Sequence, residues 1–331
     1  MGVAELRYNP LLEDWTMVAS HRQNRPQMPK DFCPFCPGSG RVPDDYAVYA
    51  YDNDFPALSA DPPRPDTVGS ALYPALEAYG KCEVILYSPD HAASLSRLAP
   101  SHIEGVIDLW AQRFAALEAD PRHKYVFIFE NRGPEVGVTM PHPHGQIYAY
   151  PYIPQKIRVE LDACAHHLER TGHCLLCDIA NEERKFGGRM LASTEYFDCF
   201  LPYFTDYPYG AFIVSKVHKT AITDLTSAER KDLAQLLHDL AAGMDALFER
   251  DFPYMMAIHQ RPVNGGDVER SYHFHIEFYP PLRSADRIKY LASSETGVWA
   301  PCNPAAVETT APQLREAILK AQRRSQGGIG K

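Results

Sequence analysis

The same order of chemically distinctive residues occurs twice along this chain, and this repeat constrains the fold more than any other feature. In each half a Cys-x-x-Cys pair precedes an apolar strand, a single histidine, an amphipathic helix, a further strand and a His-x-His segment. The apolar stripes of the two helices begin at Ile103 and Leu233 and continue at identical offsets. The sequence therefore predicts an internal duplication, in which two related units each bury a core.

The duplication predicts an α+β fold of two tandem units, each an antiparallel sheet with packed helices. A chain of 331 residues also exceeds what one core usually organises. We expect the first unit over residues 1–154 and the second over residues 155–321. The remaining residues, 322–331, are rich in Gly, Arg and Lys, and we expect a disordered tail there.

Local signals place the elements of these units. Ser101 with Glu104, and Thr226 with Glu229, have the spacing of a capping box and predict the two helix starts. Three apolar stretches are expected to be strands, at residues 46–51, 125–130 and 254–259.

Composition and charge exclude several functional classes. With 45% hydrophobic and 23% charged residues, the chain has the composition of an ordinary globular protein. Its net charge of -9 provides no basic surface for a polyanion, so we expect no nucleic-acid partner. The longest apolar runs are strand-sized and no charged-then-apolar leader opens the chain, so we expect no membrane span and a cytoplasmic location.

Paired cysteine spacing and repeated histidines together predict two metal sites. Two thiolates from a Cys-x-x-Cys pair and two imidazoles from distant segments complete the tetrahedral set of a structural zinc site. A redox role for the first pair is less favoured, because it lies in a Pro/Gly-rich loop. Any one of the histidines alone would more often be structural, and the repeated order is what favours metal. The first predicted set is Cys33, Cys36, His91 and His142, and the second is Cys174, Cys177, His218 and His273.

The first His-x-His segment contains the candidate catalytic residue. In extended backbone His142, His144 and Gln146 share one face. If His142 binds zinc, His144 remains available on the same face. A neutral imidazole is a nucleophile near neutral pH when a hydrogen bond to its other nitrogen fixes the tautomer. The alternatives for His144 are a second metal ligand and a purely structural role.

The neighbours of His144 favour the first half as the reactive one. We expect Gly145 to let the backbone approach a phosphate, and Gln146 can donate a hydrogen bond to a phosphoryl oxygen. In the second half Glu277 occupies the position of Gln146, and its carboxylate would repel a phosphoryl group. Prolines cannot donate to a ladder, so Pro141 and Pro143 predict that this segment lies at a sheet edge.

Further segments accompany the His-Pro-His-Gly-Gln sequence, and they are His21-Arg22 with Arg25-Pro26, Asn53-Asp54-Phe55, Ser88-Pro89-Asp90-His91, Glu130-Asn131-Arg132-Gly133 and Phe278-Tyr279-Pro280-Pro281-Leu282-Arg283-Ser284. Together these segments resemble the galactose-1-phosphate uridylyltransferase family, a two-unit branch of the histidine-triad superfamily. The resemblance extends from Arg7 to the region of Glu295, and its His-Pro-His-Gly-Gln segment is highly specific.

The resemblance implies a ping-pong nucleotidyltransferase of galactose metabolism. In that mechanism His144 takes the uridylyl group from UDP-glucose, releases glucose 1-phosphate and passes the group to galactose 1-phosphate, while Gln146 hydrogen-bonds the phosphoryl group. The family is generally dimeric, so we expect a homodimer. The resemblance also implies substrate contacts, with the nucleotide and phosphates for Arg22, Arg25, Asn53 and Asn131, with a phosphate for Thr139, and with the hexose for Lys289 and Glu295.

The chain departs from the best-known bacterial pattern in two places. Some members hold iron through one glutamate and three histidines, and the matching residues here are Glu160, His259, His275 and Glu277. Because glutamate replaces one histidine, we expect a second zinc in the duplicated cysteine set, with iron in the glutamate and histidine set as the alternative. No glutamine occurs in residues 294–302, where the family places a hexose contact.

Two other functions stay open on this sequence. One is an ADP-sugar phosphorylase or adenylyltransferase that uses the same histidine, as in a related plant nucleotidyltransferase that acts on ADP-glucose. The other is a zinc-stabilised nucleotide-binding module without catalysis.

Overall fold

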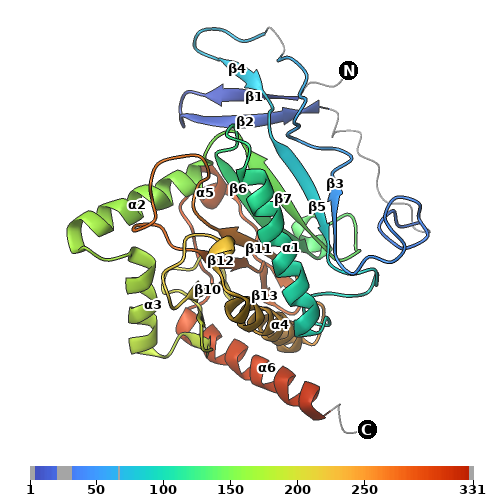
Figure 1. Cartoon of the computed structure of the whole chain (residues 1–331). Helices are drawn as coiled ribbons and strands as arrows, with labels where there is room; N and C mark the ends of the chain where they lie inside the picture. Colours follow the sequence, from blue (N-terminus) through green and yellow to red (C-terminus); the bar gives the residue numbers. More distant parts are fainter. Residues whose placement is uncertain (1–3, 21–31, 66–67, 328–331) are drawn as a thin grey trace.

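One continuous antiparallel sheet forms the centre of the protein, and the computed structural model describes residues 4–20, 32–65 and 68–327 (Figure 1). The strand order of the second half repeats that of the first in reverse, so the two units meet along a pair of central strands. In spatial order the strands are β3 (Tyr49–Asp52), β5 (Lys81–Leu86), β7 (His144–Tyr150), β6 (Tyr125–Arg132), β11 (Tyr254–His259), β12 (His275–Tyr279), β10 (Ala211–Ser215), β9 (Phe197–Phe200) and β8 (Met190–Ser193).

Helices cover both faces of this sheet. On one face α1 (Pro100–Glu118), α4 (Ser227–Phe248) and α6 (Val307–Gly327) pack over a shared core. On the other face α2 (Gln155–Thr171) and α3 (Leu175–Phe186) pack against strands of the second half. Shorter elements complete the described chain, namely α5 (Ser293–Gly297), the 3-10 turns η2 (Pro134–Val136) and η3 (Ile222–Asp224), and the hairpin of β13 (Leu282–Ser284) with β14 (Arg287–Ile288).

A separate three-stranded sheet covers part of the first half. It contains β2 (Asp14–Ala19), β1 (Ala4–Asn9) and β4 (Ala75–Glu77), with β1 in the centre. Leu6 and Leu58 pack there against Tyr148 of β7. Since His144 and Tyr148 lie on the same face of β7, this sheet covers the far end of the strand from His144.

The predicted α+β class, the internal duplication and the two apolar helix stripes are confirmed. Trp110 and Phe114 of α1 are fully buried, as are Leu233, Leu237 and Met244 of α4. Each such side chain contributes about 1.5–3 kcal/mol when it is removed from water. The two units differ from the expectation in one respect, because their sheets join along β6 and β11 into a single sheet.

One of the two predicted helix starts is confirmed and the other is wrong. Thr226 accepts from the amide of Glu229 and the Glu229 carboxylate accepts from the amide of Thr226, which is the predicted capping box. At α1 the cap is Ala99, and Pro100 is the first helical residue, so Ser101 with Glu104 forms no capping box. Proline is well suited to this position, because its fixed φ matches the helix. An N–H group here would have no hydrogen-bond partner within the helix, so its absence has no cost.

The two prolines of the His-Pro-His segment do not mark a sheet edge, so that prediction is wrong. β7 pairs with β5 on one side and with β6 on the other. The strand begins at His144, one residue after Pro143, and prolines are tolerated there because the ladder has not begun.

The C-terminal residues correct a second expectation. α6 continues to Gly327, so residues 322–327 are helical and do not form the predicted disordered tail, while residues 328–331 lie outside the described chain. Leu314 and Ile318 of α6 are buried in the main core, and Gln322 donates a hydrogen bond to Asp239 of α4 at 2.8 Å. The apolar residues of α6 that precede the predicted tail pack against α4, and the helix continues from them into the polar residues 322–327.

None of the helices in the described residues is long and apolar enough to span a membrane. The predicted boundary at residues 154 and 155 lies between β7 and α2.

Gly243 provides a test of how α6 packs on α4. A Cβ added to Gly243 would lie 2.2 Å from Ile318 Cγ1 and 2.9 Å from Ile318 Cα. We expect Gly243→Ala to push α6 away and to destabilise the protein by about 1–3 kcal/mol, seen as a lower melting temperature. Gly105→Ala in α1 is the matched control, since nothing lies within 4 Å of its added Cβ. The control is expected to gain about 0.5–1 kcal/mol from helix propensity, and equal effects of both changes would contradict this packing.

Candidate active site

The four residues of the first predicted metal set converge beside the start of β7. Cys33 and Cys36 lie in the loop before β3, His91 follows β5 and His142 precedes β7. Cys36 Sγ lies 3.4 Å from His91 Nδ1 and 3.7 Å from His142 Nδ1, and Cys33 Sγ lies 3.7 Å from His142 Nδ1. The four ligand atoms all lie within 4.8 Å of one another.

These separations fit one tetrahedral ion. Zn–S bonds of about 2.3 Å and Zn–N bonds of about 2.0 Å place sulfur and nitrogen about 3.5 Å apart at a tetrahedral angle. Burial lowers the pKa of His142 to about 4, so its ring is neutral at pH 7, as metal binding requires. His142 Nε2 donates to the Ser88 carbonyl oxygen at 2.8 Å, which leaves Nδ1 as the nitrogen that faces the thiols.

Tyr46 supports this cluster from outside. Its hydroxyl lies 2.8 Å from the Phe35 carbonyl oxygen, 2.9 Å from the Ser88 carbonyl oxygen and 3.0 Å from His142 Nε2. The strand expected over residues 46–51 accordingly begins only at Tyr49, because Tyr46 is directed into the cluster instead of into the sheet.

The second predicted set is brought together in the same way. Cys174 caps α3 and Cys177 lies in its first turn, while His218 follows β10 and His273 precedes β12. His273 Nδ1 lies 3.7 Å from Cys174 Sγ and 3.4 Å from Cys177 Sγ, and His218 Nδ1 lies 3.8 Å from Cys177 Sγ. The opposite nitrogen of His273 is 2.8 Å from Ser215 Oγ. Both cysteine and histidine sets are therefore consistent with metal sites.

The glutamate and histidine set fits a metal less well. Ligand atoms of Glu160, His259 and His275 do lie within 4.8 Å of one another. However, His259 Nδ1 lies 2.8 Å from Glu160 Oε2, which is the distance of a direct hydrogen bond. The Lys156 ammonium group donates to Glu277 at 2.7 Å and lies 3.7 Å from Glu160, so it already supplies positive charge to both carboxylates.

His144 has a defined tautomer. Its Nδ1 lies 2.8 Å from the carbonyl oxygen of His142. A carbonyl oxygen only accepts, so Nδ1 carries the proton and Nε2 is the basic nitrogen of the neutral ring. The side chain of His142 thus belongs to the first metal set, and its carbonyl oxygen orients the ring of His144.

His275 repeats this backbone contact but differs at its other nitrogen. Its Nδ1 lies 2.9 Å from the carbonyl oxygen of His273, whereas Nε2 lies 3.2 Å from Glu277 Oε1. Burial lowers and the Glu277 carboxylate raises the pKa of His275, and the net shift is upward. A proton held on Nε2 occupies the lone pair that a nucleophile needs. The Nε2 atom that is basic in the neutral ring of His144 is therefore a hydrogen-bond donor to a carboxylate at the equivalent position, His275.

A pocket of about 530 Å³ opens at His144. Asn131 and Thr139 line it together with His144. The register of β6 with β7 pairs Glu130 with Gly145, and the same register places Asn131 opposite His144. Gln146 lies on the same face of β7 as His144 and accepts a hydrogen bond from Tyr148 at 3.2 Å.

Other predicted substrate contacts lie away from these pocket residues. Asn53 accepts from the amide of Phe55 at 2.9 Å and does not line the pocket. Lys289 lies 3.9 Å from Glu295, and this pair does not line the pocket either. Arg22 and Arg25 lie outside the described residues.

Gly145 corrects an expectation about the phosphate. It lies on the face of β7 opposite His144, where an added Cβ would be 2.3 Å from the Tyr87 hydroxyl oxygen and 3.0 Å from the Phe129 carbonyl oxygen. Glycine is therefore required because the buried ring of Tyr87 packs against the strand. The prediction that Gly145 lets the backbone approach a phosphate is wrong.

Charged residues at the pocket rim were missed from the sequence. Arg97, Arg132, Arg250 and Asp251 line the pocket. Arg132 is part of a segment that carries the family resemblance, although no role followed from it. Arg250 and Asp251 come from the second half, directly after α4, and have no local signal that links them to His144.

Comparison with known proteins agrees with this arrangement over most of the chain. Residues 2–154 match the N-terminal domain of galactose-1-phosphate uridyl transferase, and residues 160–292 match its C-terminal domain. The galactose-1-phosphate uridylyltransferase of Thermotoga maritima is 39% identical over 317 residues, which cover 96% of this chain and 99% of that protein. The corresponding protein of Haemophilus influenzae is 35% identical over 308 residues, with 87% of each chain covered.

Solved structures agree with the sequence comparisons. A uridylyltransferase structure superposes with a TM-score of 0.88 at 29% identity and covers 96% of this chain and 99% of that one. An ADP-glucose phosphorylase from Arabidopsis thaliana shares the fold, with a TM-score of 0.74 at 24% identity over 94% of this chain and 97% of that one.

The duplicated sheet, with the ring of His144 oriented by a backbone carbonyl oxygen at the pocket, is the framework of a transferase enzyme. The chain belongs to the galactose-1-phosphate uridylyltransferase family.

Metal analysis tests the two cysteine and histidine sets. We expect about two zinc ions per chain. Cys177→Ser should remove about one of them and lower the melting temperature, because a structural metal contributes folding free energy. Cys302→Ser is the matched control, since Cys302 is exposed and belongs to neither set. Iron that persists in Cys177→Ser would instead assign the second metal to Glu160, His259 and His275.

A double-mutant cycle tests the contact between Gly145 and Tyr87. Gly145→Ala is expected to destabilise the protein by about 1–3 kcal/mol through overlap with the Tyr87 hydroxyl group. Tyr87→Phe removes that oxygen, so the double variant should lose less than the sum of the two single changes, measured as shifts in melting temperature. Additive losses would show that the hydroxyl group does not limit this position.

Proposed function

We propose that this chain exchanges a uridylyl group between UDP-glucose and galactose 1-phosphate by a ping-pong mechanism. The observation that carries the proposal is the 2.8 Å hydrogen bond from His144 Nδ1 to the His142 carbonyl oxygen, at the wall of the pocket. In the neutral ring this bond leaves the lone pair on Nε2, so Nε2 is the nitrogen that can attack phosphorus. The 39% identical relative is named a galactose-1-phosphate uridylyltransferase, which supports galactose 1-phosphate as a substrate and uridylyl as the transferred group.

In the first step His144 Nε2 attacks the phosphorus of the uridylyl group. A nitrogen–phosphorus bond forms, the bond to the bridging oxygen breaks, and glucose 1-phosphate leaves with that electron pair. In the second step a phosphate oxygen of galactose 1-phosphate attacks the same phosphorus. The nitrogen–phosphorus bond breaks, UDP-galactose leaves and the neutral imidazole is restored.

Amide and hydroxyl groups beside His144 would stabilise the phosphoryl oxygens during both steps. The Gln146 amide shares a face with His144 and can donate to a phosphoryl oxygen, in contrast with Glu277 in the second half. Asn131 and Thr139 line the same pocket and offer further donors. Arg22, Arg25 and Asn53 complete the proposed nucleotide and phosphate contacts, on the basis of the family resemblance.

We assign zinc to both cysteine and histidine sets. Four protein ligands leave no open coordination position, so each ion would stabilise the fold and take no part in the transfer. In the first half Cys33, Cys36, His91 and His142 would hold it, and the ligation of His142 would fix the carbonyl oxygen that orients His144.

The positions of the two residues proposed to contact the hexose support a homodimer. Lys289 and Glu295, the residues proposed to contact the hexose, lie together but do not line the pocket of His144 in the same chain. A second copy that supplies this pair to the pocket would complete the substrate site.

Mass spectrometry after incubation with UDP-glucose tests the nucleophile. The wild-type chain is expected to gain one uridylyl mass, and His144→Gly is expected to gain none, because the attacking nitrogen is absent. Gln146→Glu should form the adduct about 100-fold more slowly, since a negative charge replaces an amide donor beside the phosphoryl group. His166→Asn changes an exposed histidine of α2 and serves as the control with normal adduct formation.

The outcomes of this experiment separate the candidate functions. An adduct that survives His144→Gly would remove His144 from the mechanism. The absence of glutamine in residues 294–302 favours a different acceptor as the second candidate. ADP-glucose as the better donor, with inorganic phosphate as the better acceptor, would identify an ADP-sugar phosphorylase. No adduct with either donor, and no exchange of labelled glucose 1-phosphate into UDP-glucose, would leave a binding module.

A further inference from the structure

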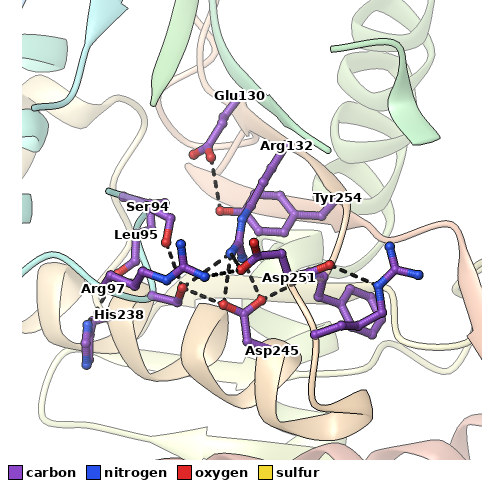
Figure 2. A network of polar contacts seen from close by, with 12 residues as sticks. Ser94, Leu95, Arg97, Glu130, Arg132, His238, Asp245, Asp251 and Tyr254 are labelled. Carbon is purple, nitrogen blue, oxygen red and sulfur yellow. Dashed lines mark hydrogen bonds and ion pairs between the residues drawn. The ribbon is translucent and has the colours of Figure 1, made fainter. Parts of the chain in front are cut away.

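Arg132, the last residue of β6, is held by side chains from the second half of the chain (Figure 2). Its guanidinium group donates to the two carboxylate oxygens of Asp245 at 2.8 and 2.9 Å, and to Asp251 at 3.2 Å. Its guanidinium carbon lies 5.7 Å from the centre of the Tyr254 ring. Asp245 belongs to α4, Asp251 to the loop that follows and Tyr254 to β11. The end of β6 is therefore fixed to the second half at three points.

The pair of Arg132 with Asp245 has a defined geometry. Only 12% of the Arg132 side chain and 20% of the Asp245 side chain are exposed. Asp245 also accepts from Ser96 Oγ at 2.6 Å and from the amide of Phe252 at 2.8 Å, so both of its oxygens have two donors. A planar guanidinium group that meets a carboxylate with two parallel bonds permits little rotation of either group.

The residues on both sides of Arg132 line the pocket of His144. Asn131 precedes it and lies opposite His144 in the register of the sheet. Gly133 follows it with a φ of 95°, and a Cβ there would lie 2.8 Å from Pro253 Cβ. The backbone thus turns sharply against the second half immediately after Arg132, and a displaced Arg132 would carry Asn131 with it.

We infer that Arg132 and Asp245 form a positioning pair for the transfer reaction, which holds Asn131 in place opposite His144. This inference rests on the proposed function. Arg132 also lines the pocket, but Asp245, Asp251 and Ser96 accept hydrogen bonds from its guanidinium group, so we assign it a positioning role through Asn131. The second half of the chain thereby contributes to the reactive pocket of the first half without supplying a nucleophile.

Single-turnover formation of the uridylyl adduct from UDP-glucose tests the pair. Asp245→Asn keeps the shape of the side chain but removes its charge and one acceptor. The rate of adduct formation is expected to fall roughly 10- to 100-fold, since a misplacement of about 1 Å has an effect of that order. Arg132→Lys keeps the charge and loses the paired contact, so a smaller loss is expected. The double variant should lose less than the product of the two single effects.

A matched ion pair elsewhere in the sheet distinguishes positioning from general stability. Glu83 of β5 accepts from Arg113 of α1 at 2.9 and 2.6 Å, and this pair does not line the pocket. Glu83→Gln is expected to lower the melting temperature and to leave the rate of adduct formation unchanged, with zinc content constant in all variants. Normal rates in both Asp245→Asn and Arg132→Lys would overturn the inference, as would an equal loss of rate in Glu83→Gln. If Asp245→Asn does not fold, the rate of Arg132→Lys decides.

Adduct formation by the wild-type chain distinguishes a failure of this inference from a failure of the proposed function. A wild-type chain that forms no adduct would overturn both together. A wild-type adduct that forms at the same rate in the variants would overturn the positioning pair alone.

Discussion

His142 is held through its side chain, its backbone carbonyl oxygen orients the ring of His144, and the arrangement of the pocket at His144 depends on these two contacts. Its Nδ1 faces two thiols at 3.7 Å, and its carbonyl oxygen accepts from His144 Nδ1 at 2.8 Å. A metal at the first set would lock the ring of His142, and the short link of one residue would transmit that rigidity to His144. A metal that stabilises the first set would then also help to orient the imidazole ring of His144.

The duplication supplies two such arrangements, and they differ at the second nitrogen of the imidazole. His144 and His275 make equivalent backbone contacts, at 2.8 and 2.9 Å. At His275 the neighbouring carboxylate of Glu277 favours the protonated ring, and Lys156 holds that carboxylate in turn. Where the first half has the amide of Gln146, the second half has the carboxylate of Glu277, which joins an internal network with His275 and Lys156. The scaffold is shared, and the difference in chemistry resides in a few side chains.

The two faces of β6 and β7 differ in what their side chains contact. One face carries His144 and Asn131, which line the pocket, and the opposite face is packed against helices and buried rings. Gly145 belongs to the packed face, where the Tyr87 hydroxyl group occupies the space of a side chain. Arg132 lies at the end of β6 and connects the pocket to α4 through Asp245. The pocket is thus supported from the second half as well as from its own unit.

Periodicity, spacing and the repeat determined much of this protein from the sequence alone. The α+β class, the helix stripes and the members of both cysteine and histidine sets follow from local patterns that occur twice, and the order of residues suffices to recognise them. The single sheet shared by both units, the helical continuation to Gly327 and the packing that requires Gly145 were decided by tertiary structure. The same is true of the contact between Arg132 and Asp245, whose residues are far apart in the chain. These features depend on which surfaces meet after folding, and a contact between distant residues leaves no period or spacing in the sequence by which it could be read.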